Sequence, residues 1–351
     1  MAEDRAGNTA ARSAGLLGSI AHRLAGDAVE LPVEGELPSF ARATGWLNSE
    51  PLTPEGLLGR VVLVDFWTYT CVNWLRTLPY LRAWDATYRE TGLTIVGVHT
   101  PEFGFEHDRD NVIAQSRALN VPYPIALDND YGVWRDHSNH FWPAVYLADD
   151  RGRVRFHHFG EGEYAMTEMV IQQLLVDAGA ADVPRDLVSV YPRGLELAAD
   201  WSSVRTPETY VGYDQSSGFA QQVVASFDRS AVYELVPLRL NEWALAGTWD
   251  VARHAGVSIE AGARIAFKFH ARDVNLVMGP ASREAPIPFR ILLDGAPPGD
   301  AHGVDTDVTG GGTLGDQRTY QLIRQHGEVT DRTVEIEFLG AGAEAYCFTF
   351  G

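Results

Sequence analysis

The chain has 351 residues, of which 45% are hydrophobic and 21% charged, and its nine Trp and fifteen Phe exclude disorder as the main state. This length predicts two domains. The formal net charge of −19 argues against partners that are nucleic acids or anionic membranes, because both require clustered cations.

The first 36 residues are small and polar, and they predict a flexible leader with one short helix near residues 16–24. The chain shows neither a membrane-length apolar run nor the pattern of a secretory signal. Its two cysteines, Cys71 and Cys347, are far apart in the sequence and exclude a disulfide framework. These features predict a cytoplasmic protein.

Residues 37–182 alternate between short apolar runs and amphipathic segments. Strands are expected at 60–67, 93–99, 144–148 and 153–159, and helices at 75–88, 111–119 and 167–177. This alternation predicts an α/β domain with a mostly parallel sheet that is covered on both faces.

Residues 184–207 contain three prolines, and we expect a linker over 183–204. Beyond it, over 205–351, apolar residues recur at every second position, with glycine- and proline-rich turns between the runs. This period is typical of strands with one buried face, so the sequence predicts an all-β sandwich as the second domain.

The segment Val64–Trp74 carries the clearest chemical signal. A buried strand ends at Trp67, and Cys71 falls where the next helix begins. Helix N-termini favour a thiolate, which is the nucleophilic form of cysteine. Pro79 lies inside this helix, and the bond between Trp142 and Pro143 is a candidate cis peptide.

These residues resemble those of the thioredoxin superfamily. The resemblance assigns Asp65 as the buried aspartate, Trp67 as the tryptophan before the active site, and Cys71 as the attacking cysteine. It likewise assigns Pro79 as the helix-kinking proline and Pro143 as the cis-proline that faces the nucleophile.

The soluble C-terminal part of DipZ-type cytochrome c biogenesis proteins is a closer match, over about residues 37–351. This likeness implies a thioredoxin-like (redoxin) domain followed by a jelly-roll sandwich similar to a carbohydrate-binding module. The matching segments are 45–48, 61–71, 97–102, 123–128, 141–144, 159–164, 206–210 and 348–351.

The chain departs from this family where its second cysteine would lie. The C-x-x-C motif reads Cys71-Val72-Asn73-Trp74, so no second thiol is available to release a mixed disulfide. We therefore expect no two-cysteine reductase activity and an Asp65 without its usual partner. Trp74 is expected either as a lid over the thiol or as an exposed aromatic residue. We also expect the protein to lack the membrane-embedded domain that delivers electrons in DipZ proteins.

The sequence predicts a cytoplasmic monothiol redox protein whose catalytic residue is Cys71. The thiol would form a mixed disulfide or a sulfenic acid, with a low-molecular-weight thiol, a protein disulfide or a peroxide as partner. A redox-inactive scaffold and a one-cysteine peroxidase, suggested by Thr68-x-x-Cys71, remain alternatives. The expected site-lining residues are Asp65, Trp67, Thr68, Thr70, Asn73, Trp74, Glu102, Trp142 and Pro143.

No cofactor or metal site is expected. His137 and His140 have a spacing that could suit a metal, but we interpret them as loop or interface residues. In the sandwich, Trp243, Trp249 and Tyr210 could stack on a glycan, although buried core aromatics are the commoner explanation. Cys347 is expected to be buried in the same sandwich.

Overall fold

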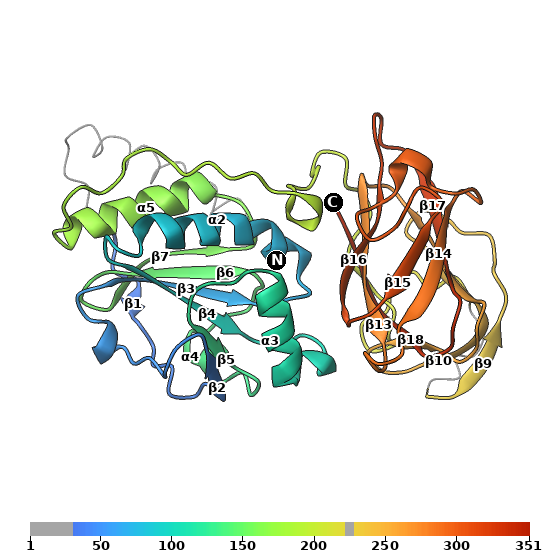
Figure 1. Ribbon diagram of the computed structural model, residues 1–351, viewed down its shortest axis with the longest axis horizontal. Helices are drawn as coiled ribbons and strands as arrows, with labels where there is room; N and C mark the ends of the chain where they lie inside the picture. The colour runs from blue at the N-terminus through green and yellow to red at the C-terminus, as the bar shows by residue number, and fades with distance from the viewer. Residues whose placement is uncertain (1–30, 222–227) are drawn as a thin grey trace. The chain divides into compact units, whose positions relative to one another are not determined.

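The computed structural model describes residues 31–221 and 228–351. The chain divides into two compact units, the first ending at Tyr191 and the second beginning at Pro192 (Figure 1). The expected helix near residues 16–24 lies outside the described residues. Among those described, no helix is long and apolar enough to cross a membrane.

The first unit is built on a seven-stranded sheet with the order β1-β7-β6-β3-β4-β5-β2. Only the β3–β4 and β4–β5 pairs are parallel, and the other four pairs are antiparallel. The strands are β1 (Gly35–Glu36), β2 (Gly45–Leu47), β3 (Val61–Trp67), β4 (Leu93–His99), β5 (Ile125–Leu127), β6 (Ala144–Ala148) and β7 (Arg153–Phe159).

The expectation of a mostly parallel sheet is therefore wrong. Strands β6 and β7 are joined by a tight turn, in which the Gly152 amide donates to the Asp149 carbonyl at 2.9 Å. So short a connection can join only antiparallel strands, because a parallel pair needs a long crossover. The positions of β4, β6 and β7 agree with the sequence prediction, and β3 differs from it by one residue.

Helices cover both faces of this sheet (Figure 1). Helices α2 (Val72–Tyr88) and α5 (Tyr164–Asp177) lie over one face, and α3 (Arg109–Ala118) and α4 (Gly132–Asp136) lie on the other. Side chains of β3 alternate between these faces. Val62, Val64 and Phe66 pack in a core cluster with Val133 of α4. The intervening residues of β3 therefore point toward α2.

The second unit is an all-β sandwich, and one long strand takes part in both of its sheets. Strand β10 (Trp243–Val251) pairs with β12 through its first half and with β9 and β11 through its second half. Gly247, with φ of 84°, lies at the change of partner, in a backbone conformation that L side chains rarely adopt.

One apolar core fills the space between the two sheets, built from alternate residues of the strands. The strands other than β10 are β8 (Thr209–Tyr210), β9 (Ser230–Tyr233), β11 (Gly256–Ser258), β12 (Ala263–Phe269), β13 (Asp273–Pro280), β14 (Ile287–Leu293), β15 (Gly311–Leu314), β16 (Arg318–Arg324), β17 (Arg332–Phe338) and β18 (Ala343–Phe350). Short 3₁₀ turns occur at Glu55–Leu57, Gly104–His107, Gly194–Glu196 and Gly299–Ala301.

Candidate functional site

Cys71 is the N-cap residue of α2 and is half-buried. Its carbonyl accepts from the Leu75 amide at 3.0 Å, in the first turn of the helix. Its Sγ lies 3.8 Å from the carbonyl oxygen of Trp142, and the Trp142–Pro143 peptide is cis. The thiol therefore lies between the positive end of a helix and the loop that carries Pro143.

Trp74 follows Cys71 by three residues, in the first turn of α2, and is fully buried. Its ring stacks on Trp67, with centroids 4.2 Å apart, and its Nε1–H donates to Asp65 Oδ2 at 2.9 Å. Both interpretations of Trp74 as a lid or an exposed aromatic are therefore wrong. The expectation that Asp65 lacks a partner is also wrong, because the helix turns the indole toward the sheet and onto the carboxyl group.

Burial dominates the electrostatics of Asp65. Desolvation raises the pKa of this carboxyl to about 7, although hydrogen bonding from Trp74 and Tyr123 lowers it in part. Near neutral pH the Asp65 carboxyl group is thus partly protonated and partly ionised. Tyr123 is itself fully buried, and desolvation raises the pKa of its hydroxyl well above the usual value.

His99 ends strand β4 beside Trp67 and is also fully buried. The two rings meet edge to face, with centroids 4.9 Å apart. Desolvation lowers the pKa of His99 to about 3, so the imidazole is neutral. Neither His99 nitrogen, nor Trp67 Nε1, has a hydrogen-bond partner among the described residues. Such unpaired polar atoms are costly in a protein core and are typical of functional or hydrated sites.

Glu106 is a buried carboxylate that the sequence did not reveal. It accepts from Thr70 Oγ1 at 2.7 Å and from the Thr70 amide at 3.3 Å, directly before Cys71. It also accepts from the amides of Glu102 and Phe103, at 2.7 and 2.9 Å. Burial raises the pKa of Glu106, and these bonds oppose the rise. The carboxylate ties the residue before Cys71 to the turn after β4.

The other predicted site residues lie in the same part of the first unit. Thr68 is buried between Trp67 and the Cys71 turn. Asn73 Oδ1 accepts from Arg76 Nη1 at 3.3 Å, and Arg76 forms a buried ion pair of 3.1 Å with Glu161. The Trp142 indole donates to the carbonyl oxygen of Thr100 at 3.1 Å, and this bond fixes the loop beside the thiol.

Neither histidine of the expected loop is placed for metal binding. His137 is buried against Phe66 and Tyr146, and its Nδ1 lies 2.9 Å from the Val133 carbonyl oxygen. Burial lowers its pKa to about 4. Within the described ranges, no three His, Cys, Asp or Glu side chains converge on a common point.

In the second unit, the two tryptophans considered for stacking on a glycan are not at the surface. Trp243 and Trp249 are buried in the sandwich core. Cys347 is buried in β18 opposite Val277 of β13, and neither cysteine forms a disulfide. The tryptophans thus stabilise the fold and offer no stacking surface.

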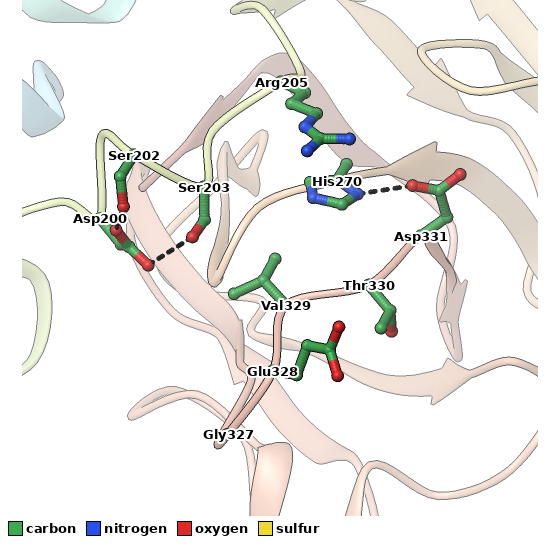
Figure 2. Close-up of a pocket in the computed structure, with 10 residues that line it drawn as sticks. All are labelled: Asp200, Ser202, Ser203, Arg205, His270, Gly327, Glu328, Val329, Thr330 and Asp331. Atoms are coloured by element: carbon green, nitrogen blue, oxygen red, sulfur yellow. Dashed lines mark hydrogen bonds and ion pairs between the residues drawn. The ribbon is translucent and has the colours of Figure 1, made fainter.

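A polar pocket of about 550 Å³ opens on the second unit (Figure 2). Ser203 Oγ donates to Asp200 at 2.7 Å on one side, and His270 Nδ1 lies 2.6 Å from Asp331 Oδ1 on the other. None of the described residues that line it is Trp, Tyr or Phe. The full lining is Asp200, Ser202, Ser203, Arg205, His270, Gly327, Glu328, Val329, Thr330 and Asp331.

Known proteins are similar to parts of both units. Residues 206–351 match the family described as "Thioredoxin like C-terminal domain". Protein DipZ of Mycobacterium tuberculosis is 34% identical over 330 residues, which are 92% of this chain and 44% of that protein. The chain thus spans less than half of its relative's length. The thiol-disulfide oxidoreductase YkuV of Bacillus subtilis is 25% identical over 40% of this chain and 95% of its own. A solution structure of an oxidised thioredoxin-like protein is 25% identical, with a TM-score of 0.38, over 41% of this chain and 96% of that one.

Proposed function

Since this chain belongs to the thioredoxin superfamily and is similar to DipZ over most of its length, we propose that it is a thiol-disulfide exchange protein that works with one cysteine. The Cys71 thiolate attacks a disulfide R–S–S–R′, forms Cys71–S–S–R and releases R′–S⁻. An external thiolate R″–S⁻ then attacks the sulfur atom bonded to R in the mixed disulfide. This step gives R–S–S–R″ and restores the Cys71 thiolate.

The observation that carries this proposal is the contrast between positions 71 and 74. Cys71 is half-exposed at a helix N-cap and beside the Trp142 carbonyl, whereas position 74 holds a buried indole. The other cysteine, Cys347, is buried in the second unit. Release of the mixed disulfide therefore falls to a thiol from outside the chain.

The proposal gives Asp65 no proton-transfer step. In a two-cysteine protein a buried acid at this place could accept the proton of the second thiol. Here its Oδ2 accepts from Trp74, and the acid supports the indole. Thr70 and Glu102 take part through Glu106, which holds the backbone before Cys71 in place.

The proposed partners are a low-molecular-weight thiol and a protein disulfide, and the proposed compartment is the cytoplasm. A peroxide would instead oxidise the thiolate to a sulfenic acid and leave as the alcohol or water. These two reactions give different masses on Cys71, so one experiment separates them.

The test incubates the full chain with glutathione disulfide or with hydrogen peroxide and measures the intact mass. We expect one glutathione adduct that dithiothreitol removes, and none on Cys71→Ser. A peroxide-dependent mass gain of one oxygen without a glutathione adduct would favour the peroxidase. If Cys71 reacts with neither reagent while the denatured chain does, the scaffold alternative is correct.

A further inference from the structure

The polar pocket of the second unit contains two kinds of charged side chain (Figure 2). Asp200 is already satisfied, because two serine hydroxyls of the pocket donate to its carboxylate oxygens at 2.6 and 2.7 Å. The side chains of Arg205 and Glu328, by contrast, have no hydrogen-bond or ion-pair partner among the described residues. One cation and one anion of the pocket are thus available to a ligand.

His270 supplies a third available group, and the orientation of its ring is fixed. The residue is nine-tenths buried, and Asp331 Oδ1 lies 2.6 Å from its Nδ1. Because an ionised carboxylate only accepts hydrogen bonds, Nδ1 carries the proton, and Nε2 of the neutral ring is an acceptor. Nε2 has no hydrogen-bond partner within residues 31–221 and 228–351, and in Figure 2 it points away from Asp331. The ring therefore presents Nε2 to an N–H or O–H group of a ligand.

These three side chains come from separate parts of the second unit. Arg205 precedes β8, His270 directly follows β12, and Glu328 lies in the turn between β16 and β17. In Figure 2 Arg205 and Glu328 lie on opposite sides of the pocket, with the His270 ring between them. The pocket volume of about 550 Å³ falls within the range of small-molecule sites, roughly 300–1,000 Å³. A ligand that reaches both charges must have charged groups at its two ends.

The charge balance of the pocket narrows the choice of ligand. Asp200, Glu328 and Asp331 supply three carboxylates against the single guanidinium of Arg205. A ligand that carries only carboxylates is repelled by this surplus, and a ligand that carries only ammonium groups leaves Arg205 unpaired. A zwitterion meets both charges through charge-assisted hydrogen bonds.

We propose that this pocket binds a small peptide-like zwitterion, two or three residues long. The ligand carboxylate pairs with Arg205, its ammonium group pairs with Glu328, and one of its amide N–H groups donates to His270 Nε2. This binding site is independent of the proposed function, because it requires no reaction at Cys71.

Three peptides that differ only at their ends test the inference on the full chain at pH 7. Triglycine has both charges, acetyl-triglycine lacks the ammonium group, and triglycine amide lacks the carboxylate. Affinities are measured by isothermal titration calorimetry, with competition against triglycine for the weaker ligands. We expect triglycine to bind about tenfold more tightly than either capped peptide, as for the loss of one hydrogen bond between charged groups.

Two variants place each end of the ligand. Arg205→Gln should bind triglycine about tenfold more weakly than the wild type does, but it should bind triglycine amide equally, because that peptide has no carboxylate to lose. Glu328→Gln should weaken triglycine by a similar factor and leave acetyl-triglycine unchanged. The matched controls are Arg239→Gln and Glu284→Gln, which remove the same charges from exposed positions of the second unit outside the pocket. Both controls should bind triglycine as the wild type does.

Equal affinity for the three peptides, or no binding of triglycine at about 10 mM, overturns the inference. Affinities that are unchanged in both pocket variants, or lowered equally in the controls, overturn the location of the site. An unchanged midpoint of urea unfolding shows that each variant is folded. The rate of glutathione adduct formation on Cys71 is measured on the same proteins, and its absence would overturn the proposed function while leaving this site intact.

Discussion

In the first unit, the carboxyl groups of Asp65 and Glu106 and the imidazole of His99 are fully buried around the Cys71 segment. In the second unit, the carboxyl groups of Glu328 and Asp331 in the polar pocket are exposed. Burying ionisable groups is costly, so a fold keeps them where they hold a site together or perform chemistry. Exposed, paired groups like those of the pocket contribute little. This difference supports the first unit as the reactive one.

The two cysteines show the same contrast. Cys71 lies half-buried at a helix N-cap, and Cys347 is buried in the middle of a strand. Only the first has an environment that favours a nucleophilic thiolate. If burial around Cys71 is as consequential as this comparison implies, substitutions there should have larger effects than substitutions in the second unit.

The largest effect is expected for Trp74→Cys, which restores the C-x-x-C sequence. The substitution removes a fully buried indole from Trp67 and from Asp65, so it should cost about 3–5 kcal/mol of stability. The measurement is urea unfolding with dithiothreitol present, so that no new disulfide contributes. Any gain in insulin reduction should therefore be small.

Trp201→Cys is the matched control, because Trp201 is 58% exposed. It should change stability by less than about 1 kcal/mol. A Trp74→Cys protein as stable as this control would show that the indole is not needed to fill the core behind Cys71.

The next largest effect concerns pH and Asp65. Its pKa is raised from 3.8 to about 7 in the folded state, so the folded chain holds a proton that the unfolded chain releases between these values. This contribution to stability is complete below pH 3.8 and is lost as the pH rises through about 7. The slope is at most about 1.4 kcal/mol per pH unit.

His99 and His137 act in the opposite direction over part of this window, because their lowered pKa values make the unfolded state bind more protons. The informative quantity is therefore the difference between the wild type and Asp65→Asn, which keeps an acceptor for Trp74. From pH 4 to 7 the wild type should lose stability relative to this variant. Parallel curves would contradict the raised pKa of Asp65.

A smaller effect is expected for Glu106→Gln. The Glu106 carboxylate accepts hydrogen bonds from Thr70, Glu102 and Phe103, whereas the NH₂ group of glutamine is itself a donor. At least one hydrogen bond is therefore lost, which should lower the free energy of unfolding by about 1–3 kcal/mol. Faster hydrogen exchange at the Thr70 and Phe103 amides would locate the change. Glu102→Gln, a half-buried neighbour, is the control and should leave these amides protected.

Local patterns account for what the sequence predicted well. The strand before Cys71 and the helix after it follow from a continuous apolar run and from helical spacing, which neighbouring residues determine. The side of α2 that faces the sheet is a tertiary property, so the burial of Trp74 on Asp65 was not visible. Glu106 was missed because its donors meet only when the turn after β4 reaches the Cys71 loop. The antiparallel β6–β7 pair was missed because apolar periodicity does not distinguish parallel from antiparallel neighbours, whereas the short turn between the two strands does.

The smallest effect is expected in the second unit, for His270→Gln. The His270 side chain is 11% exposed and contacts Asp331, which is 50% exposed and open to solvent, so the pair itself contributes about 0–1 kcal/mol, and glutamine keeps a polar side chain of similar size. Stability should fall by about 1 kcal/mol, and the rate of glutathione adduct formation on Cys71 should not change. His137→Gln is the comparison in the first unit, since that ring packs against Phe66 and Tyr146 in the core and its loss should cost more. A slower reaction of Cys71 in His270→Gln would break the contrast between the units, because the pocket would then contribute to the chemistry of the thiol. An unchanged rate would restrict the reactive chemistry to residues of the first unit.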